Sequence, residues 1–311
     1  MTENENIRIV DAADKYTNSI LELLNEDSEI ISREYWEWKY LTPVVAKKLA
    51  IIAVNKKNEV VGHSGSIAQF IQINNKKYVG LKGEDVKTKK EETEKGIFGK
   101  IIKEGINRAE KQKLILYGFP NKLGKTVLKK FGLREEGKIF NFLKIFPKNQ
   151  QSNKIKLIKV NKPIEDINII WNKFKHEKVC VIRDLEFFKW RFFEKPNNNY
   201  NVFIAYKKNG PIGYIVVEKY RFGISIIDFI SVGYHKEILN AMVNYYSKEP
   251  VFYLEGYFTD NLIISKLREM GFIKMPFSEI PLMVSCFIPK IKKAGILNTK
   301  NWFLTKADIE L

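Results

Sequence analysis

The stretch DVKTKKEETEKGIFGKII, residues 85–102, carries the features that decide the fold. An apolar strand is expected to end near Thr88, a polar loop covers 89–95, and a helix begins at Gly96. A helix that begins after a loop presents amide N–H groups without intrahelical partners and the positive end of its dipole, and both attract phosphate. Gly96 and Gly99 would let such a group approach the backbone closely. The stretch therefore predicts a junction that can hold an anion.

The segments on either side of this junction indicate an α/β fold. Apolar residues at steps of three and four predict helices, and apolar runs bounded by polar turns predict strands. In chain order we expect a helix at 15–26, strands at 48–55, 59–73 and 76–87, a helix at 96–112, a strand at 114–119 and a helix at 121–131 that ends at Gly132.

The two halves of the chain resemble each other, which predicts a duplicated unit. EYWEWKYLTP at 34–43 matches EFFKWRFFEKP at 186–196, so that Trp38 and Trp190 lie 152 residues apart. Each match is followed by a predicted hairpin with a Lys-Lys-Asn turn, at 49–67 and 200–220. The correspondence continues in order: 83–88 matches 227–232, and 113–133 matches 251–272.

The repeat and the polar stretch between its copies predict the domain boundaries. We expect an N-terminal domain at 1–147, a linker at 148–158, a C-terminal domain at 159–290 and a tail at 291–311. The second copy has a shorter segment after its central strand, with only Gly233 before the helix, which argues against a second phosphate site. The tail could return across the first copy's site or cover the second domain.

Composition limits the classes of function. Lys and Arg number 53 against 36 for Asp and Glu, a net charge of +17. The lysines are scattered in pairs between apolar segments, which favours a solvated basic surface over a dedicated nucleic-acid face. Cys180 and Cys286 lie far apart and indicate neither a disulfide framework nor a metal site. No apolar run is long enough to span a membrane, and the polar opening differs from a signal peptide, so we expect a cytoplasmic protein.

Residues 80–133 resemble the acetyl-CoA signature of the GNAT (GCN5-related) N-acetyltransferase superfamily. The resemblance rests on VKT at 86–88, KGIFGK at 95–100, YGFPN at 117–121 and FGL at 131–133. It implies two tandem units, each a mixed and mostly antiparallel sheet flanked by helices. It also implies an N-acyltransferase that moves an acetyl or other acyl group from CoA to a primary amine of a small molecule or amino sugar.

The resemblance also implies which residues hold acetyl-CoA or another acyl-CoA. Backbone amides at the end of the central strand would hold the pantetheine arm, the loop and the helix start would hold the pyrophosphate, and Asn121 would lie beside the cofactor. The residues for the pantetheine arm are Val86, Lys87 and Thr88. The residues for the pyrophosphate are Thr93, Glu94, Lys95, Gly96, Ile97, Phe98, Gly99 and Lys100.

Acyl transfer needs a neutral amine, a polarised thioester carbonyl and a proton for the departing thiolate. By the resemblance, a backbone amide near Val86 or Lys87 polarises the carbonyl. Glu84 and Asp85 are the candidate bases, and strand alternation predicts that only one of them lies on the cofactor side. Tyr117 is the nearest tyrosine that could donate a proton, although an aromatic in an apolar strand also suits the core. His63 could line a substrate pocket or be a structural imidazole.

Three residues depart from the family pattern and support other functions. Thr93 stands where the phosphate loop has Arg or Gln, Glu94 brings negative charge to that loop, and Leu128 occupies the place of a proton-donating tyrosine. These departures favour a catalytically degenerate GNAT-fold binding or scaffold protein as an alternative. A basic nucleic-acid-associated protein is a further alternative, which the net charge suggests.

Overall fold

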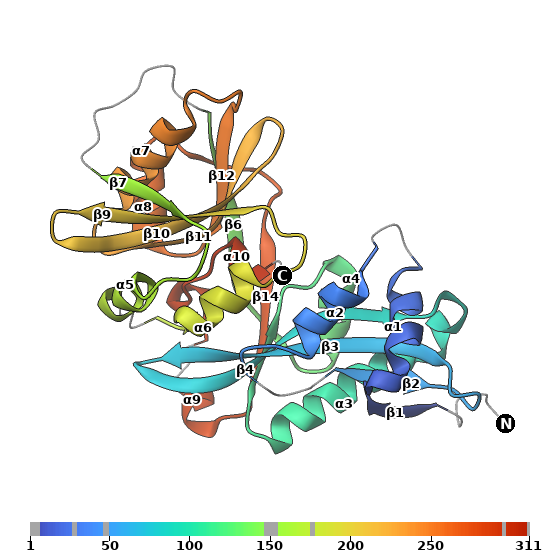
Figure 1. Cartoon of the computed structure of the whole chain (residues 1–311). Coiled ribbons are helices and arrows are strands. Elements are labelled where there is room, and N and C mark those ends of the chain that lie inside the picture. Colours follow the sequence, from blue (N-terminus) through green and yellow to red (C-terminus); the bar gives the residue numbers. More distant parts are fainter. Residues whose placement is uncertain are drawn as a thin grey trace. The chain divides into compact units, whose positions relative to one another are not determined.

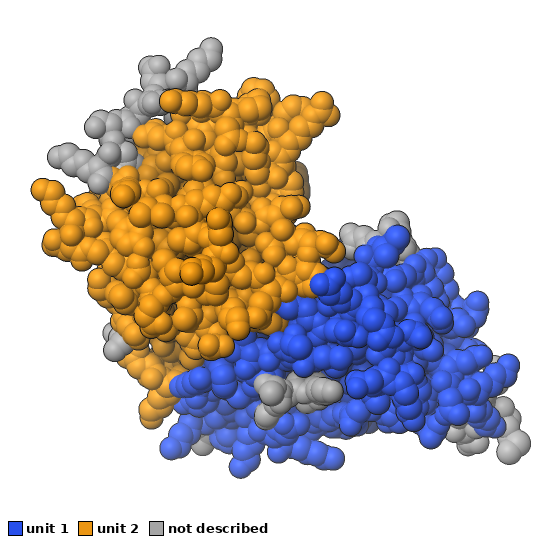
Figure 2. Space-filling view, in the orientation of Figure 1, with its two compact units in different colours: residues 1–71, 77–136, 281–297 blue, residues 72–76, 137–280, 298–311 orange. Residues whose placement is uncertain are grey.

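The chain divides into two compact units in the computed structural model, which describes residues 7–26, 30–45, 50–145, 155–174, 178–293 and 297–309. Unit 1 comprises residues 1–71, 77–136 and 281–297, and unit 2 comprises 72–76, 137–280 and 298–311 (Figure 2). Of the linker expected at 148–158, residues 148–154 lie outside the described residues, and β7 (Lys156–Val160) already begins within it.

Unit 1 contains the elements that the first half of the sequence predicts, and several short elements in addition, among them the helix α2 at Arg33–Tyr40 (Figure 1). Its strand order is β1-β2-β3-β4-β5-β14. In chain order its elements are β1 (Arg8–Asp11), η2 (Asp14–Tyr16), α1 (Thr17–Leu24), α2 (Arg33–Tyr40), β2 (Ile51–Val54), β3 (Val60–Ile73), β4 (Lys76–Thr88), η3 (Lys90–Lys95), α3 (Ile97–Lys111), β5 (Ile115–Gly118), α4 (Lys122–Lys130), β14 (Ile280–Cys286) and α9 (Pro289–Lys293).

Helices cover both faces of this sheet. On one face, Ile97 and Ile101 of α3 pack against Ile51, Ala53 and Val61. The two glycines of β3 separate the faces, because a methyl group at Gly62 would meet Ile101 of α3 whereas one at Gly65 would meet Tyr40 of α2. Figure 1 shows α3 on one side of β3, with α1 and α2 on the other. The sheet therefore brings α2 to the face of β4 opposite α3.

Unit 2 repeats the order strand, strand, strand, helix, strand, helix. Its strand order is β7-β9-β10-β11-β12-β6, with β13 also paired to β6. Its elements are β6 (Arg134–Ile145), β7, α5 (Asp166–Phe174), β8 (Cys180–Val181), α6 (Leu185–Phe188), η4 (Lys189–Phe193), β9 (Tyr200–Lys207), β10 (Gly210–Lys219), β11 (Gly223–Ser231), α7 (His235–Tyr246), β12 (Tyr253–Phe258), α8 (Asn261–Glu269), β13 (Ile273–Lys274), η5 (Thr299–Asn301) and α10 (Lys306–Ile309).

Each unit's sheet includes a strand from the other half of the sequence. β6 follows α4 in the chain but pairs antiparallel with β12, from Phe140 opposite Phe258 to Ile145 opposite Tyr253. β14 follows α8 but pairs antiparallel with β5. The exchange places the compact units across the boundaries expected at 147 and 290. Only β4 with β5 and β11 with β12 pair in parallel among the strand registers described, so each sheet is mixed and mostly antiparallel, as expected.

The end of the chain packs into unit 2. Trp302, Phe303 and Leu304 are fully buried, and the backbone amide of Phe303 donates to the carbonyl oxygen of Val179. Of the two placements expected for the tail, the described residues 298–309 take the one within unit 2. None of the helices described has the length and apolarity that a membrane crossing requires.

Candidate functional site

The junction between β4 and α3 has the geometry that the sequence predicts. The 3-10 helix η3 leads into Gly96, which lies in the left-handed region with φ of 72° and occupies the N-cap position of α3. A side chain at Gly96 would meet no atom within 4 Å, so the requirement for glycine here is conformational. The N-cap supplies no side-chain acceptor, and the first turn of α3 contains no acidic residue. The start of α3 is therefore suited to an anion.

β4 extends beyond its parallel pairing with β5. The register described runs from Gly80 to Lys82, and β4 then continues to Thr88. The hydroxyl oxygen of Thr88 is buried and has no hydrogen-bond partner among the residues described. An orphaned hydroxyl at the last residue of β4 is a polar atom that a ligand could satisfy.

The loop residues expected to hold pyrophosphate have local partners. Lys95 Nζ lies 3.1 Å from Glu92 Oε2, and the Thr93 hydroxyl donates to the carbonyl oxygen of Lys90. The side chain of Glu94 lies outside what the structure describes. These contacts leave the backbone amides at the start of α3, rather than the loop side chains, as the stronger anion ligands.

Two of the residues carried by the resemblance have structural roles. A methyl group at Gly99 would come within 3.2 Å of the Phe131 ring, so this glycine allows α3 and the end of α4 to pack closely. Asn121 is the N-cap of α4, and its Oδ1 accepts a hydrogen bond of 2.8 Å from the Gly124 amide. Neither role excludes a ligand, but each accounts for the residue without one.

A buried polar cluster lies on the α2 side of β4. Lys39 Nζ lies 2.8 Å from Asp85 Oδ2 and 3.2 Å from Glu84 Oε2. The Tyr40 hydroxyl donates to the same Asp85 oxygen over 2.5 Å. Lys82 Nζ lies 2.5 Å from Glu84 Oε1. Both lysine side chains are nearly or fully buried, whereas the carboxylate side chains keep 16% and 21% exposure, so solvent reaches the cluster from the carboxylate side.

Glu84 and Asp85 contact the same lysine although they are consecutive in a strand. Strand alternation predicts opposite sides for neighbouring residues. Asp85 has a φ of 46°, in the left-handed region that non-glycine residues rarely adopt, and this interrupts the alternation. Both carboxylates therefore reach one lysine, and which of them lies on the cofactor side stays a prediction.

His63 contacts the main chain of Asp85. Its Nδ1 lies 2.7 Å from the Asp85 carbonyl oxygen, and because a carbonyl only accepts, Nδ1 carries the hydrogen. The ring is fully buried, and Nε2 has no hydrogen-bond partner among the described residues. Burial lowers the pKa of His63, which keeps the imidazole neutral with its lone pair on Nε2.

The charges of the cluster fix its protonation. Burial alone would lower the pKa of Lys39, but Glu84 and Asp85 outweigh it and raise that pKa. Burial alone would raise the pKa of Asp85, yet the charge and hydrogen bond of Lys39 and the hydrogen bond of Tyr40 lower it below 3.8. Burial and the Asp85 charge raise the pKa of Tyr40. Asp85 is consequently ionised and a weak proton acceptor.

Tyr117 lies in the core of unit 1. Its side chain is almost fully buried, and its hydroxyl donates to Gln69 Oε1 on β3. The hydroxyl proton that a general acid would transfer is therefore already in a hydrogen bond to Gln69. Whether Tyr117 acts in chemistry stays a prediction.

The sequence identified Glu84 and Asp85 but not the residues that hold them. Lys39 and Tyr40 lie 45 to 46 residues away in the chain, and neither was a candidate. A signal was present, because Lys39 follows Trp38 in the repeated aromatic segment. Lys82 shows none, since a lysine in a strand usually faces solvent.

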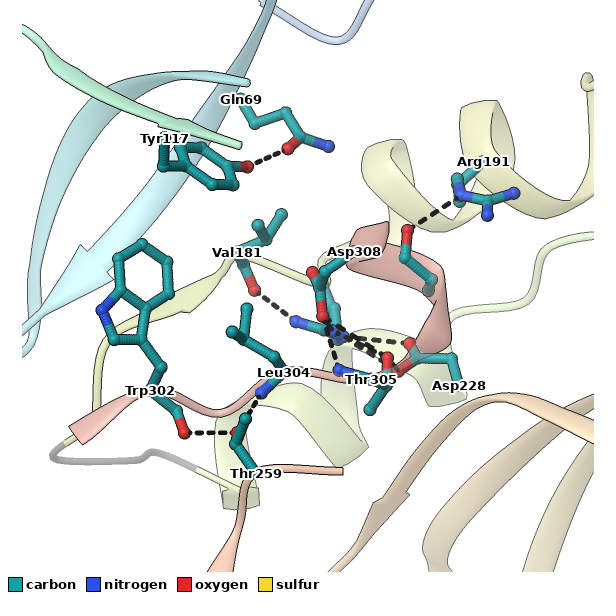
Figure 3. A network of polar contacts seen from close by, with 12 residues as sticks. Gln69, Tyr117, Val181, Arg191, Asp228, Thr259, Trp302, Leu304, Thr305 and Asp308 are labelled. Carbon is teal, nitrogen blue, oxygen red and sulfur yellow. Dashed lines mark hydrogen bonds and ion pairs between the residues drawn. The ribbon is translucent and has the colours of Figure 1, made fainter. Parts of the chain in front are cut away.

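An aspartate on the central strand of unit 2, Asp228, lies in a sealed network. Arg183 Nε lies 2.9 Å from Asp228 Oδ2, and Arg183 Nη2 lies 2.6 Å from Asp308 Oδ2. The hydroxyls of Tyr214 and Thr305 each donate to Asp228 over 2.8 Å. Figure 3 shows Asp228, Thr305 and Asp308 converging on one point. All five side chains are fully or almost fully buried, so this aspartate is enclosed by the chain's own tail.

Comparisons with known proteins give matches at the level of structure. No family model matches the sequence, and no curated protein matches it. A probable N-acyltransferase from Enterococcus faecalis superposes with a TM-score of 0.71 at 13% identity, covering 90% of this chain and 72% of the other. A GCN5-related N-acetyltransferase from Anabaena variabilis gives 0.70 at 12% identity, covering 90% and 73%.

A third match is more distant. N-myristoyltransferase from Saccharomyces cerevisiae, solved with bound myristoyl-CoA, superposes with a TM-score of 0.60 at 10% identity, covering 90% of this chain and 82% of that one. Identities this low establish the fold alone. The chain has the fold of the GCN5-related N-acetyltransferases, which confirms the fold class predicted from the sequence.

Proposed function

We propose that the protein is an acyl-CoA-dependent N-acyltransferase that acts on a primary amine, with acetyl-CoA as donor and a small molecule or amino sugar as acceptor. The observation that carries the proposal is the junction at Gly96: a left-handed residue without a side chain that opens a helix of 15 residues, with free space where a Cβ would lie. The fold shared with known acyltransferases supports the same function.

The residues at this junction fit a CoA ester. Amide groups of Ile97, Phe98 and Gly99 would bind the pyrophosphate, and the unpartnered hydroxyl of Thr88 at the end of β4 offers a further polar group. Between residues 89 and 100 there are four lysines and three glutamates, a small positive balance. Acyl-CoA would supply the activated acyl group as a thioester. The protein's part is to hold that group and to orient the amine.

Glu84 and Asp85 are the candidates for accepting the amine's proton, directly or through water. Both oxygens of Glu84 lie near lysines, and one oxygen of Asp85 already accepts two hydrogen bonds. The contacts of Asp85 lower its pKa and so weaken its carboxylate as a base. We therefore expect the rate of transfer to rise with pH up to the pKa of the acceptor amine itself, which a profile of initial rates against pH measures.

Calorimetry with acetyl-CoA tests the junction directly. Gly96→Asp places a carboxylate beside the expected pyrophosphate and should weaken binding about fivefold or more, because like charges a few ångströms apart repel by at least about 1 kcal/mol. Gly233→Asp is the matched control, since Gly233 also has a positive φ with free space around it and precedes α7 in unit 2. Equal affinity in the two variants would remove the phosphate site from this junction.

Binding without transfer is the second candidate function. Two observations favour it. Leu128 stands where the family pattern has a proton-donating tyrosine, and the Tyr117 hydroxyl already donates its hydrogen bond to Gln69. Release of free thiol from acetyl-CoA in the presence of a panel of primary amines separates the two functions. Tight binding with no thiol release above the rate in buffer would establish the second.

A further inference from the structure

One residue within the central strand of unit 1, near its end, has a left-handed backbone conformation. Asp85 has a φ of 46°, although strand residues on either side are extended and the residue is not glycine. Side chains disfavour this conformation because Cβ crowds the backbone. Such strain persists where surrounding contacts hold it, and it is concentrated at functional sites.

Three side chains hold Asp85 from outside its own strand. Lys39 Nζ and the Tyr40 hydroxyl both contact Asp85 Oδ2, at 2.8 Å and 2.5 Å, and both come from α2. His63 Nδ1, on β3, donates to the carbonyl oxygen of Asp85 over 2.7 Å. The side chain and the main chain of one residue are thus held from two different elements. We call these three residues the Asp85 clamp.

The members of the Asp85 clamp are themselves immobilised. Lys39, Tyr40 and His63 keep at most 5% of their surface exposed, and the Tyr40 and His63 rings pack edge to face with centroids 5.7 Å apart. Lys39 is further fixed by Glu84. A buried cation, a buried hydroxyl and a buried imidazole directed at one strained residue form a rigid support for the backbone that follows it.

We propose that Lys39, Tyr40 and His63 are positioning residues which hold Asp85 in its left-handed conformation and thereby orient the backbone amide near Val86 or Lys87 toward the carbonyl of a bound acyl thioester. This inference rests on the proposed function. It assigns Asp85 a conformational role, because the contacts of its carboxylate with Lys39 and Tyr40 hold β4 against α2. The Lys39 and Tyr40 contacts serve that role and oppose a role in proton transfer, because they lower the basicity of the carboxylate.

Two ligands separate carbonyl contact from CoA binding. Acetyl-CoA carries the thioester carbonyl, and S-ethyl-CoA, a thioether of nearly the same shape, lacks it. Calorimetry of the wild-type protein should show a preference for acetyl-CoA over S-ethyl-CoA. If neither ligand binds, the proposed function fails together with this inference. If both bind equally, CoA binding stands and the inference fails.

Two substitutions at Asp85 then test the conformational role. Both Asp85→Ala and Asp85→Gly remove the carboxylate, but only glycine adopts a positive φ without crowding. We expect Asp85→Ala to reduce the preference for acetyl-CoA about tenfold and Asp85→Gly to reduce it less than about threefold, with S-ethyl-CoA affinity unchanged in both. Equal losses in the two variants would overturn the inference and leave the carboxylate as the acting group.

A milder substitution covers the case in which the alanine variant does not fold. Tyr40→Phe removes one hydrogen bond of the Asp85 clamp and should reduce the preference about threefold, and adding Asp85→Gly should cause no further reduction. Tyr206→Phe is the matched control, because it removes a tyrosine–aspartate contact in unit 2. An unchanged preference in Tyr40→Phe would also overturn the inference.

Discussion

The central strands of the two units each carry an aspartate, and the surroundings of these two residues differ. Asp85 in unit 1 contacts a lysine and keeps 21% of its side chain exposed. Asp228 in unit 2 contacts an arginine and is fully buried, with Thr305 of the tail donating to it. The preceding strand supplies a partner in both units, His63 in one and Tyr214 in the other.

The strand-to-helix junction that follows each aspartate is also more open in unit 1 than in unit 2. In unit 1, eight residues separate Thr88 from the start of α3, whereas in unit 2 three residues separate Ser231 from the start of α7. The Ser231 hydroxyl accepts from the Tyr234 amide at the second junction, so a side chain takes up an amide there. One architecture thus keeps its polar centre accessible in unit 1 and fills it with its own tail in unit 2.

The largest expected effect is the loss of Arg183. Arg183→Met leaves Asp228 and Asp308 buried without their cation, and breaking a buried ion pair on one side costs about 3–5 kcal/mol of the free energy of unfolding. Urea denaturation measures it. Lys189→Met is the control, because the Lys189–Glu194 pair is about half exposed and should contribute less than about 0.5 kcal/mol. If Arg183→Met lowers the free energy of unfolding no more than Lys189→Met does, Asp228 and Asp308 are neutral in the folded protein.

The two tyrosines on the aspartates provide a direct comparison of the units. Tyr214→Phe removes a hydrogen bond to a fully buried carboxylate and should cost about 1.5–3 kcal/mol. Tyr40→Phe should cost about 1 kcal/mol, because water can reach Asp85 and Lys39 still binds it. The midpoints of urea unfolding of both variants give the comparison, and the reverse order would show that unit 1 is the more sealed.

Substitution of the two left-handed glycines should lower stability equally but should affect acetyl-CoA binding only at Gly96. Gly96→Ala and Gly233→Ala each force a side chain into a positive φ with no clash, at about 1 kcal/mol. Only Gly96→Ala should also weaken acetyl-CoA. Thermal unfolding and calorimetry on the same samples decide this, and a matching loss of affinity in Gly233→Ala would contradict the assignment of one phosphate site.

The smallest expected effect is on how stability depends on pH, and its sign differs between the units. The lowered pKa of Asp85 adds stability above pH 3.8 that is lost as pH falls through the folded-state value. Burial raises the pKa of Asp308 despite the opposing charge of Arg183, so its contribution falls as pH rises above 3.8.

Asparagine variants isolate these two contributions. Asp85→Asn should remove the loss of stability seen in acid, and Asp308→Asn should remove a decline seen on the way to neutral pH. Urea unfolding of each variant and the wild type across the acidic range measures both slopes. Slopes of the same sign at the two positions would contradict the assignment.

Much of unit 1 could be predicted because its signals are local. The helix expected at 96–112 is α3 at Ile97–Lys111, and the strands expected at 59–73 and 76–87 are β3 and β4. The element at 33–40 was not predicted as a helix, although Ser32 caps it through the Tyr35 amide. Its dense aromatic residues obscure the periodicity on which helix prediction depends.

The candidate site could be predicted only in part. Gly96 and the acids of β4 were proposed as site residues from the residues around them, whereas the members of the Asp85 clamp that hold Asp85 from α2 were not. Its members contact Asp85 across 22 to 46 residues of chain, and no pattern within β4 indicates a positive φ at Asp85. The exchange of β6 and β14 between the sheets was equally hidden, since either sheet offers an edge of the same chemistry.

The sequence by itself determined most of the element order of unit 1 and the start of α3 after Gly96, because hydrophobic period and glycine conformation are properties of neighbouring residues. Only the tertiary structure decided which aspartate is accessible, which strand completes each sheet and where the tail packs. Those outcomes depend on contacts between residues far apart in the chain, whose energies are set by burial and by the partners that packing brings together.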